Sequence, residues 1–188
     1  MFKNTNQGYG WVAIGLHWMS AITVIGLFAV GFWMVELTYY SKWYQVAPHW
    51  HKSIGLMLLL ATVIRIAWKQ LNPKVSKAAE HKAWEQKAAS IAHGLIYMLL
   101  FTIMVSGILI STADGRGILV FDWFELPSPG LLFGKEQLFE NQADIAGLIH
   151  QYAAYSLIAL VVVHGAGAIK HHFVDKDNTL KRMLRPEK

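Results

Sequence analysis

Residues 148–165 read LIHQYAAYSLIALVVVHG, an almost entirely apolar run with one histidine near each end. As a helix, the longer apolar segment 145–170 can cross a hydrocarbon core of about 30 Å. His150 and His164 are fourteen residues apart, so they point in nearly the same direction and lie about 21 Å apart along the helix axis. Polar side chains inside a bilayer are costly and normally mark function. We therefore expect two separate sites on this segment.

Three other segments are equally long and apolar, at residues 11–35, 49–70 and 88–111. The chain has 188 residues, of which 54% are hydrophobic and only 15% charged, and this is too apolar for a soluble domain of its length. The predicted fold is therefore an all-α, polytopic membrane protein, a single domain over residues 1–188 with four transmembrane helices in a bundle. The first segment is too long and too rich in tryptophan for a cleaved signal peptide, so we expect it to be retained.

The basic residues indicate the orientation of the chain. Most of them fall between the second and third segments and after the fourth, whereas residues 36–50 and 112–144 carry only Lys42, Arg116 and Lys135. By the positive-inside rule, both termini are cytoplasmic. The expected surroundings are a lipid bilayer, with no nucleic-acid partner.

Two further histidines lie at depths that match the first two. His17 is near the cytoplasmic start of the first span, level with His164, and His51 is at the outer start of the second span, level with His150. The chain has no cysteine, which excludes covalent c-type haem and thiolate-bound iron–sulfur clusters. Two imidazoles from facing helices suit a non-covalent b-type haem, whose iron takes two axial nitrogens.

The depth argument predicts two haem b groups between the helices. The iron ligands are His17 and His164 on the cytoplasmic side, and His51 and His150 on the outer side. Any one such histidine is more often a hydrogen-bonded packing residue, but four that agree in orientation and depth favour ligation. Zinc is a weaker alternative, because its sites usually need three or four nearby protein ligands and these histidines come in twos.

His93 is a fifth histidine at a functional depth, at the cytoplasmic level of His17 and His164. It could replace either of them as an iron ligand, or carry protons near a quinone. We favour the proton role, because span four already supplies one ligand to each haem and His17 has no other evident task.

Three more residues are candidates for contacts with the cofactor. Arg65 follows His51 by fourteen residues on the same helix face, so its guanidinium can bind the haem propionates on the cytoplasmic side, or alternatively extend to the lipid headgroups. Lys52 can meet the propionates of the outer haem in the same way. Gly55 lies one turn from His51 and allows close approach of a porphyrin or a helix.

With this layout in place, the sequence resembles the bacterial cytochrome b561 family over essentially its whole length. The resemblance is carried by LHW at 16–18, HKSIG at 51–55, AHGLIYMLL at 92–100, ISTADG at 110–115 and HHFVDKDNTLKRM at 171–183, together with the spacing of the last two ligand candidates. It implies the same histidine pairing, and a quinone such as ubiquinone as one redox partner. It also implies superoxide oxidation as a possible enzymatic activity.

The leading hypothesis is transmembrane electron transfer through two bis-histidine b haems, between a periplasmic-side redox partner and the quinone pool. A second is a cytochrome b subunit that anchors a periplasmic redox protein or a dehydrogenase, and a third is a haem-free transporter or metal-binding membrane protein. A superoxide oxidase coupled to ubiquinone reduction is a further possibility. The outer connections are acidic overall, which slows an anion and favours a basic protein, unless Lys42, His49 and Lys52 form a local positive funnel.

Overall fold

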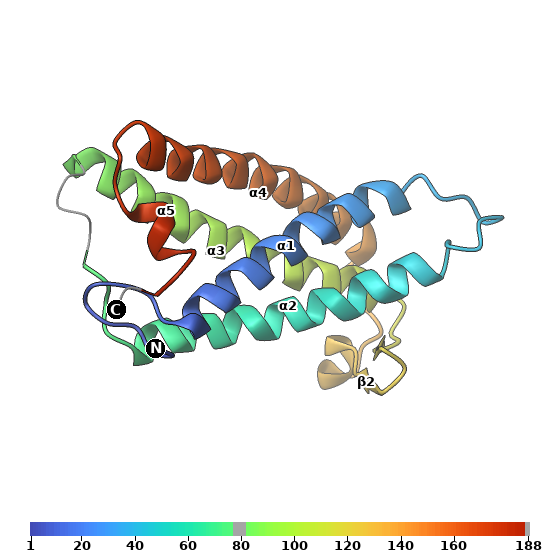
Figure 1. Ribbon diagram of the computed structural model, residues 1–188. Helices are drawn as coiled ribbons and strands as arrows, with labels where there is room; N and C mark the ends of the chain where they lie inside the picture. Colours follow the sequence, from blue (N-terminus) through green and yellow to red (C-terminus); the bar gives the residue numbers. More distant parts are fainter. Residues whose placement is uncertain (77–81, 187–188) are drawn as a thin grey trace. The chain divides into compact units, whose positions relative to one another are not determined.

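Long helices account for most of the chain. The computed structural model describes residues 1–76 and 82–186. Its four long helices are α1 (Trp11–Met34), α2 (Val46–Leu71), α3 (Ala83–Ser111) and α4 (Gln142–Phe173) (Figure 1). Each is long and apolar enough to cross a membrane. Large apolar side chains such as Ile22, Leu60 and Val162 are more than half exposed, as expected of side chains in contact with lipid. The expected four-helix membrane fold is confirmed.

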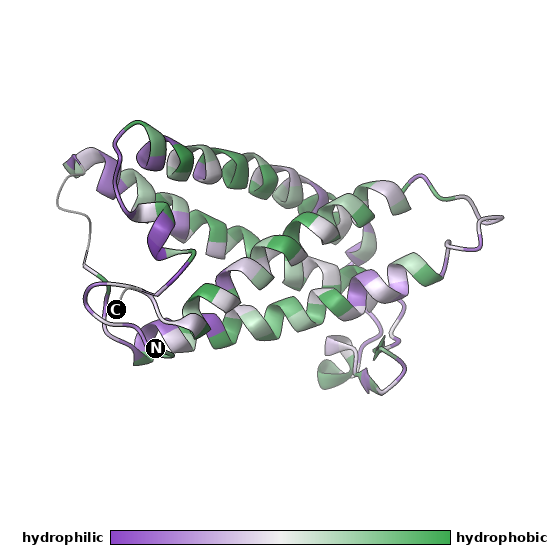
Figure 2. Cartoon of the chain, in the orientation of Figure 1, coloured by the Kyte–Doolittle hydropathy of each residue, from purple (hydrophilic) through white to green (hydrophobic). Residues whose placement is uncertain are grey.

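Three of the four long helices extend beyond the apolar segments that predicted them, whereas α1 ends at residue 34, one residue before the end of its segment. α2 begins at residue 46 instead of 49, α3 at 83 instead of 88, and α4 at 142 instead of 145. Hydropathy marks only the part of a helix that suits lipid, whereas the backbone hydrogen bonds continue into the polar ends. Figure 2 shows apolar residues dominating the middle of the helices, with hydrophilic residues gathered toward their ends and in the connections.

Contacts divide the chain into two compact units, which we call the terminal unit and the loop unit. The terminal unit comprises Met1–Ile22, Leu60–Tyr97 and Ile158–Lys188, and the loop unit comprises Thr23–Leu59 and Met98–Leu157. Each unit therefore contains a part of all four long helices. A single domain over residues 1–188 stays a prediction, and its residues 77–81 and 187–188 lie outside the described residues.

The two ends of the chain pack together in the terminal unit (Figure 1). The indole Nε1 of Trp18 donates to the carbonyl of Met183 at 2.6 Å, just after the short helix α5 (Thr179–Arg182). On α4, the Lys170 ammonium pairs with Glu85 of α3 at 2.7 Å and with Asp175 at 2.8 Å. These contacts hold the C-terminal segment against the helices that carry the candidate residues of this unit.

The loop unit contains a small β-hairpin that the sequence did not predict. Strands β1 (Ile118–Val120) and β2 (Phe124–Leu126) pair in antiparallel register, followed by the 3-10 helix η1 (Pro129–Phe133). Three residues, Phe121–Trp123, connect the paired Val120 and Phe124. Phe121 and Asp122 have φ angles of 48° and 60°, in the left-handed region that tight hairpin turns use.

The hairpin tip docks on the first turns of α2. The backbone N–H of Phe121 donates to the Ser53 hydroxyl at 3.1 Å, and the Phe121 ring meets the Trp50 ring edge-on at 5.5 Å. Ser53 is fully buried. These contacts compensate for the strain of the turn. They also bring the turn close to His51, because Ser53 is only two residues from His51 in the chain.

Candidate functional site

His51 of α2 and His150 of α4 face each other within the loop unit. Their ring centres are 6.3 Å apart and their planes are inclined by 64°. A bond from a metal to an imidazole nitrogen is about 2 Å and the ring centre lies about 1 Å beyond that nitrogen, so two imidazoles on opposite sides of one metal have centres about 6 Å apart. The spacing of these rings therefore fits two axial ligands of one haem iron.

Hydrogen bonding orients His150 for this role. Its Nδ1 lies 2.8 Å from the carbonyl oxygen of Ile103 and 3.3 Å from the Ser106 hydroxyl, both on α3. A carbonyl only accepts, so the Nδ1 hydrogen is the donor and Nε2 keeps a lone pair for a metal. The Nδ1 of His51 is buried and has no hydrogen-bond partner within residues 1–76 and 82–186.

The terminal unit holds a second pair with the same spacing. The rings of His17 on α1 and His164 on α4 have centres 6.4 Å apart and planes inclined by 69°. His93 on α3 is brought to the same place, but its ring centre is only 5.1 Å from that of His164. That distance is short for two ligands on opposite sides of one metal, so the geometry favours His17 as the partner of His164.

Arg65 of α2 contacts this pair directly. Its Nη2 lies 2.8 Å from Nδ1 of His17. An arginine can only donate, so His17 accepts through Nδ1 in this arrangement, and a neutral ring then carries its hydrogen on Nε2. Ligation of a metal through Nε2 of neutral His17 and this hydrogen bond therefore exclude each other.

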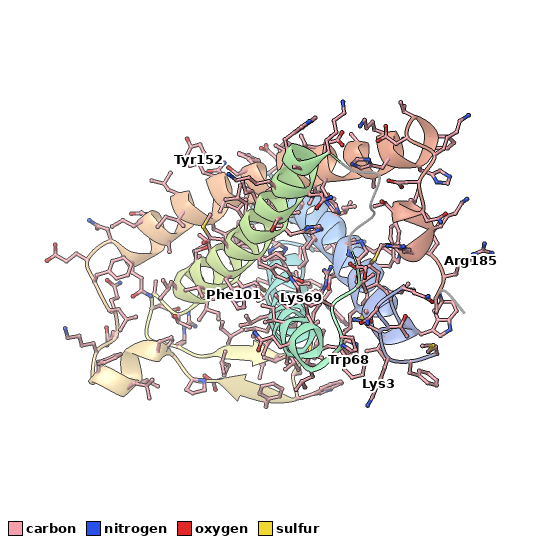
Figure 3. All side chains as sticks on the ribbon, turned by 90° about the vertical axis from the view of Figure 1, so that its left-hand side faces the viewer. Lys3, Trp68, Lys69, Phe101, Tyr152 and Arg185 are labelled. Carbon is pink, nitrogen blue, oxygen red and sulfur yellow. The ribbon has the colours of Figure 1, made fainter. Side chains whose placement is uncertain are left out.

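A second cation lies beside Arg65. The guanidinium carbon of Arg65 and the ammonium of Lys69 lie 5.6 and 5.7 Å from the centre of the Tyr97 ring. Figure 3 labels Lys69, which lies in the last turn of α2. Neither cation forms an ion pair with a carboxylate among the described residues, so the cluster is suited to an added anionic group.

The remaining candidates lie near His51 in the loop unit. Lys52 is half-buried. A Cβ added at Gly55 would meet nothing within 4 Å, so no side chain of the protein presses on it, and its role toward a porphyrin stays a prediction. Two glycines that the sequence did not single out, Gly31 and Gly107, lie instead against the histidine rings of the loop unit.

No larger metal site competes with the pairs. In the part of the chain that the structure describes, no group of three or more His, Cys, Asp or Glu residues is arranged to hold a metal ion. Each pair offers two nitrogens, which is the protein contribution to a haem iron with two axial ligands.

Pairs of histidines held between apolar helices are the arrangement of a membrane-bound b-type cytochrome. The profile of the prokaryotic cytochrome b561 family matches residues 8–186. The chain therefore belongs to this family of electron-transport cytochromes, for which haem b is the implied cofactor. The resemblance noted in the sequence is confirmed.

Several relatives match almost the whole chain. It is 47% identical over 183 residues to cytochrome b561 homolog 2 of Escherichia coli (strain K12), covering 97% of this chain and 94% of that protein. It is 27% identical over 185 residues to the probable superoxide oxidase CybB of Yersinia pestis, covering 95% and 97%. It is 29% identical over 184 residues to cytochrome b562 of Cereibacter sphaeroides, covering 95% and 96%.

Proposed function

We propose that this protein carries electrons across the bacterial inner membrane through two b haems, between a periplasmic-side redox partner and the quinone pool. The observation that carries the proposal is the recurrence of one geometry, a pair of imidazoles with centres 6.3 or 6.4 Å apart, in each of the two units. His51 and His150 hold the periplasmic-side haem, and His17 and His164 hold the cytoplasmic-side haem. The distribution of Lys and Arg supports cytoplasmic termini.

The bound haems supply the one-electron chemistry, and the chain binds and orients them. The Ile103 carbonyl fixes the tautomer of His150 and increases its basicity as a ligand. Apolar helices exclude water from both sites. Lys52 is the candidate partner of the outer haem's carboxylates, and Gly55, one turn from His51 on α2, is the candidate for close approach of the outer porphyrin.

Arg65 would have to change partner if His17 is a haem ligand. With Nε2 of neutral His17 on a metal, Nδ1 would carry the hydrogen and could not accept from Arg65. The guanidinium would then be available to hold a haem carboxylate, for which its geometry is suited. Lys69 lies over the same Tyr97 ring and offers a second cation to that group.

The first experiment counts haems in matched variants. Redox difference spectra and haem quantification of the purified protein should show two haems per chain in the wild type. His150→Ala and His164→Ala should each remove a different haem. His172→Ala changes an α4 histidine outside both pairs and should keep two. If His150→Ala or His164→Ala retains two haems, the pairing is wrong, and if the wild type shows no band of reduced b haem, the proposal fails.

His93 is assigned to proton transfer beside a quinone. Quinone reduction consumes protons together with electrons, and histidine is the side chain suited to exchange protons near neutral pH. The 5.1 Å separation from His164 and the exposure of the His93 side chain support this role over ligation. His93→Ala should keep both haems and slow haem reoxidation by a quinone in stopped-flow mixing. Loss of one haem would instead make His93 a ligand.

Superoxide oxidation is the second candidate, favoured by the similarity to the probable superoxide oxidase of Yersinia pestis. The positive funnel that an anion needs is weakened in this chain, because His49 faces the carboxylate of Asp122 at 3.5 Å. Mixing the purified protein with superoxide while following haem reduction tests this activity directly. Reduction only by a basic periplasmic protein would favour the electron-transfer or anchor-subunit role.

A further inference from the structure

Two glycines of the loop unit lie against the two histidines of its pair. A Cβ at Gly31 of α1 would lie 3.3 Å from Cε1 of His51. A Cβ at Gly107 of α3 would lie 3.2 Å from Cε1 and 3.4 Å from Nδ1 of His150. Contacts in this range are tighter than nine in ten real Cβ contacts, so a methyl group at either position requires the ring to move by a few tenths of an ångström.

This close approach is confined to the loop-unit pair. The other helical glycines in the described part of the chain have no such neighbour within 4 Å of an added Cβ, and these are Gly15, Gly26, Gly55, Gly94, Gly147, Gly165 and Gly167. General glycine packing between membrane helices therefore does not account for the contacts of Gly31 and Gly107. The two histidines lie on α2 and α4, and the two glycines lie on α1 and α3, so all four long helices contribute to the site.

We propose that Gly31 and Gly107 are positioning residues that fix the imidazole planes of His51 and His150. The inference rests on the proposed function, in which these two histidines bind one haem iron. The His51 ring occupies the space that a Cβ at Gly31 would need, and its Nδ1 has no hydrogen bond among the described residues that would hold the ring instead. His150 is held between the hydrogen bond to the Ile103 carbonyl and the steric contact with Gly107, one helical turn further along α3.

The orientation of the planes has a measurable consequence. The two rings are inclined by 64°. The angle between axial imidazole planes governs the splitting of the iron d orbitals, and with it the g-values of the oxidised haem and its midpoint potential, because the surroundings of a ligand tune the metal that it binds. In the terminal unit, His17 and His164 are met by Arg65 and His93 instead of glycines. Substituting the two glycines should therefore affect one haem only.

The experiment compares two test variants with two matched controls. Gly31→Ala and Gly107→Ala are tested against Gly26→Ala on α1 and Gly94→Ala on α3, where an added Cβ meets open space. Low-temperature EPR of the oxidised protein and a redox titration are recorded for each. The haem that His150→Ala removes identifies the loop-unit signal. Both test variants should shift the g-values and the midpoint potential of that haem and leave the other haem unchanged, whereas both controls should match the wild type.

The outcomes separate this inference from the proposed function. If the wild type binds no haem, the proposed function fails. If it binds two haems and both test variants match the controls, the glycine inference is overturned while the proposed function stands. Equal shifts of both haems, or loss of both haems from the test variants, also overturn it, because a displacement confined to one pair leaves the other haem intact. The unchanged haem thus reports correct folding in the same sample.

Discussion

Replacing Arg65 by glutamine removes a cation that contacts the predicted ligand His17. Its Nη2 lies 2.8 Å from Nδ1 of His17. A guanidinium that moves only from this nitrogen to a nearby haem carboxylate would stay on the order of 7 Å from an iron on the far nitrogen of the ring. At an effective dielectric constant of about 20, a unit charge at that distance contributes about 2 kcal/mol. For a one-electron couple this corresponds to about 90 mV, and to about 45 mV where solvent halves the effect.

The sign of the shift tests the proposed exchange of partners. If Arg65 binds a haem carboxylate, its positive charge stabilises the more negative, reduced haem, so Arg65→Gln should lower the midpoint potential of the terminal-unit haem. If Arg65 instead stayed on Nδ1 of a ligating His17, the ring would be an imidazolate. In Arg65→Gln the cation would be missing, so Nδ1 of His17 would bind a proton. The midpoint potential of the terminal-unit haem would then rise.

A redox titration followed by optical spectroscopy measures the shift. The terminal-unit haem is identified as the one that His164→Ala removes. Arg185→Gln is the matched control, because it also removes one positive charge but from an exposed side chain that extends away from the helices (Figure 3). A raised potential, no shift, or an equal shift in the control would refute the assignment of Arg65 to a haem carboxylate.

Three further predictions concern stability. Ser53→Ala leaves the N–H of Phe121 without its partner and should lower the free energy of unfolding in detergent by about 1–3 kcal/mol. The control Ser20→Ala loses only a hydrogen bond within its own helix and should lower it by less. Gln142→Leu breaks two hydrogen bonds at a buried side chain and should destabilise by about 2 kcal/mol or more, measured in the same way. The hydrogen bond from Lys170 holds the pKa of the Asp175 carboxyl below its usual range. The stabilisation that this ion pair gives the folded protein is therefore present above about pH 4 and is lost as pH falls through the lowered pKa. Protease sensitivity of the C-terminal segment should therefore rise only at acid pH, and Asp175→Asn should raise it at neutral pH.

The spans and the histidine pairs followed from the sequence because their signals are local. Apolar length predicts a membrane helix, and the fourteen-residue interval between His150 and His164 fixes their relative direction through the helical repeat alone. The partners His17 and His51 followed from depth, because alternating helices place the start of one beside the end of another. The structure brings both predicted pairs to the spacing that one metal requires.

The contacts around the histidines did not follow from the sequence. Gly31 and Gly107 look like any glycine in a membrane helix, and only the approach of a third helix distinguishes them from Gly55. The hairpin was missed for a related reason, because its turn residues are Phe121 and Asp122 instead of the usual Asn-Gly or Asp-Gly. Packing on Ser53 offsets the cost of that turn, and such a compensation is visible only in three dimensions.

The two sites differ in their surroundings, and this difference predicts the direction of electron flow. In the loop unit, the Ile103 carbonyl makes His150 a more basic ligand, which stabilises oxidised iron and lowers the midpoint potential. In the terminal unit, the positive charges of Arg65 and Lys69 would stabilise reduced iron and raise the midpoint potential. If the loop unit lies on the periplasmic side, as proposed, electrons should run downhill from the periplasmic-side haem to the haem near the cytoplasm. Single-haem proteins made by His150→Ala and His164→Ala give the two potentials separately. A higher potential for the loop-unit haem would reverse the proposed direction.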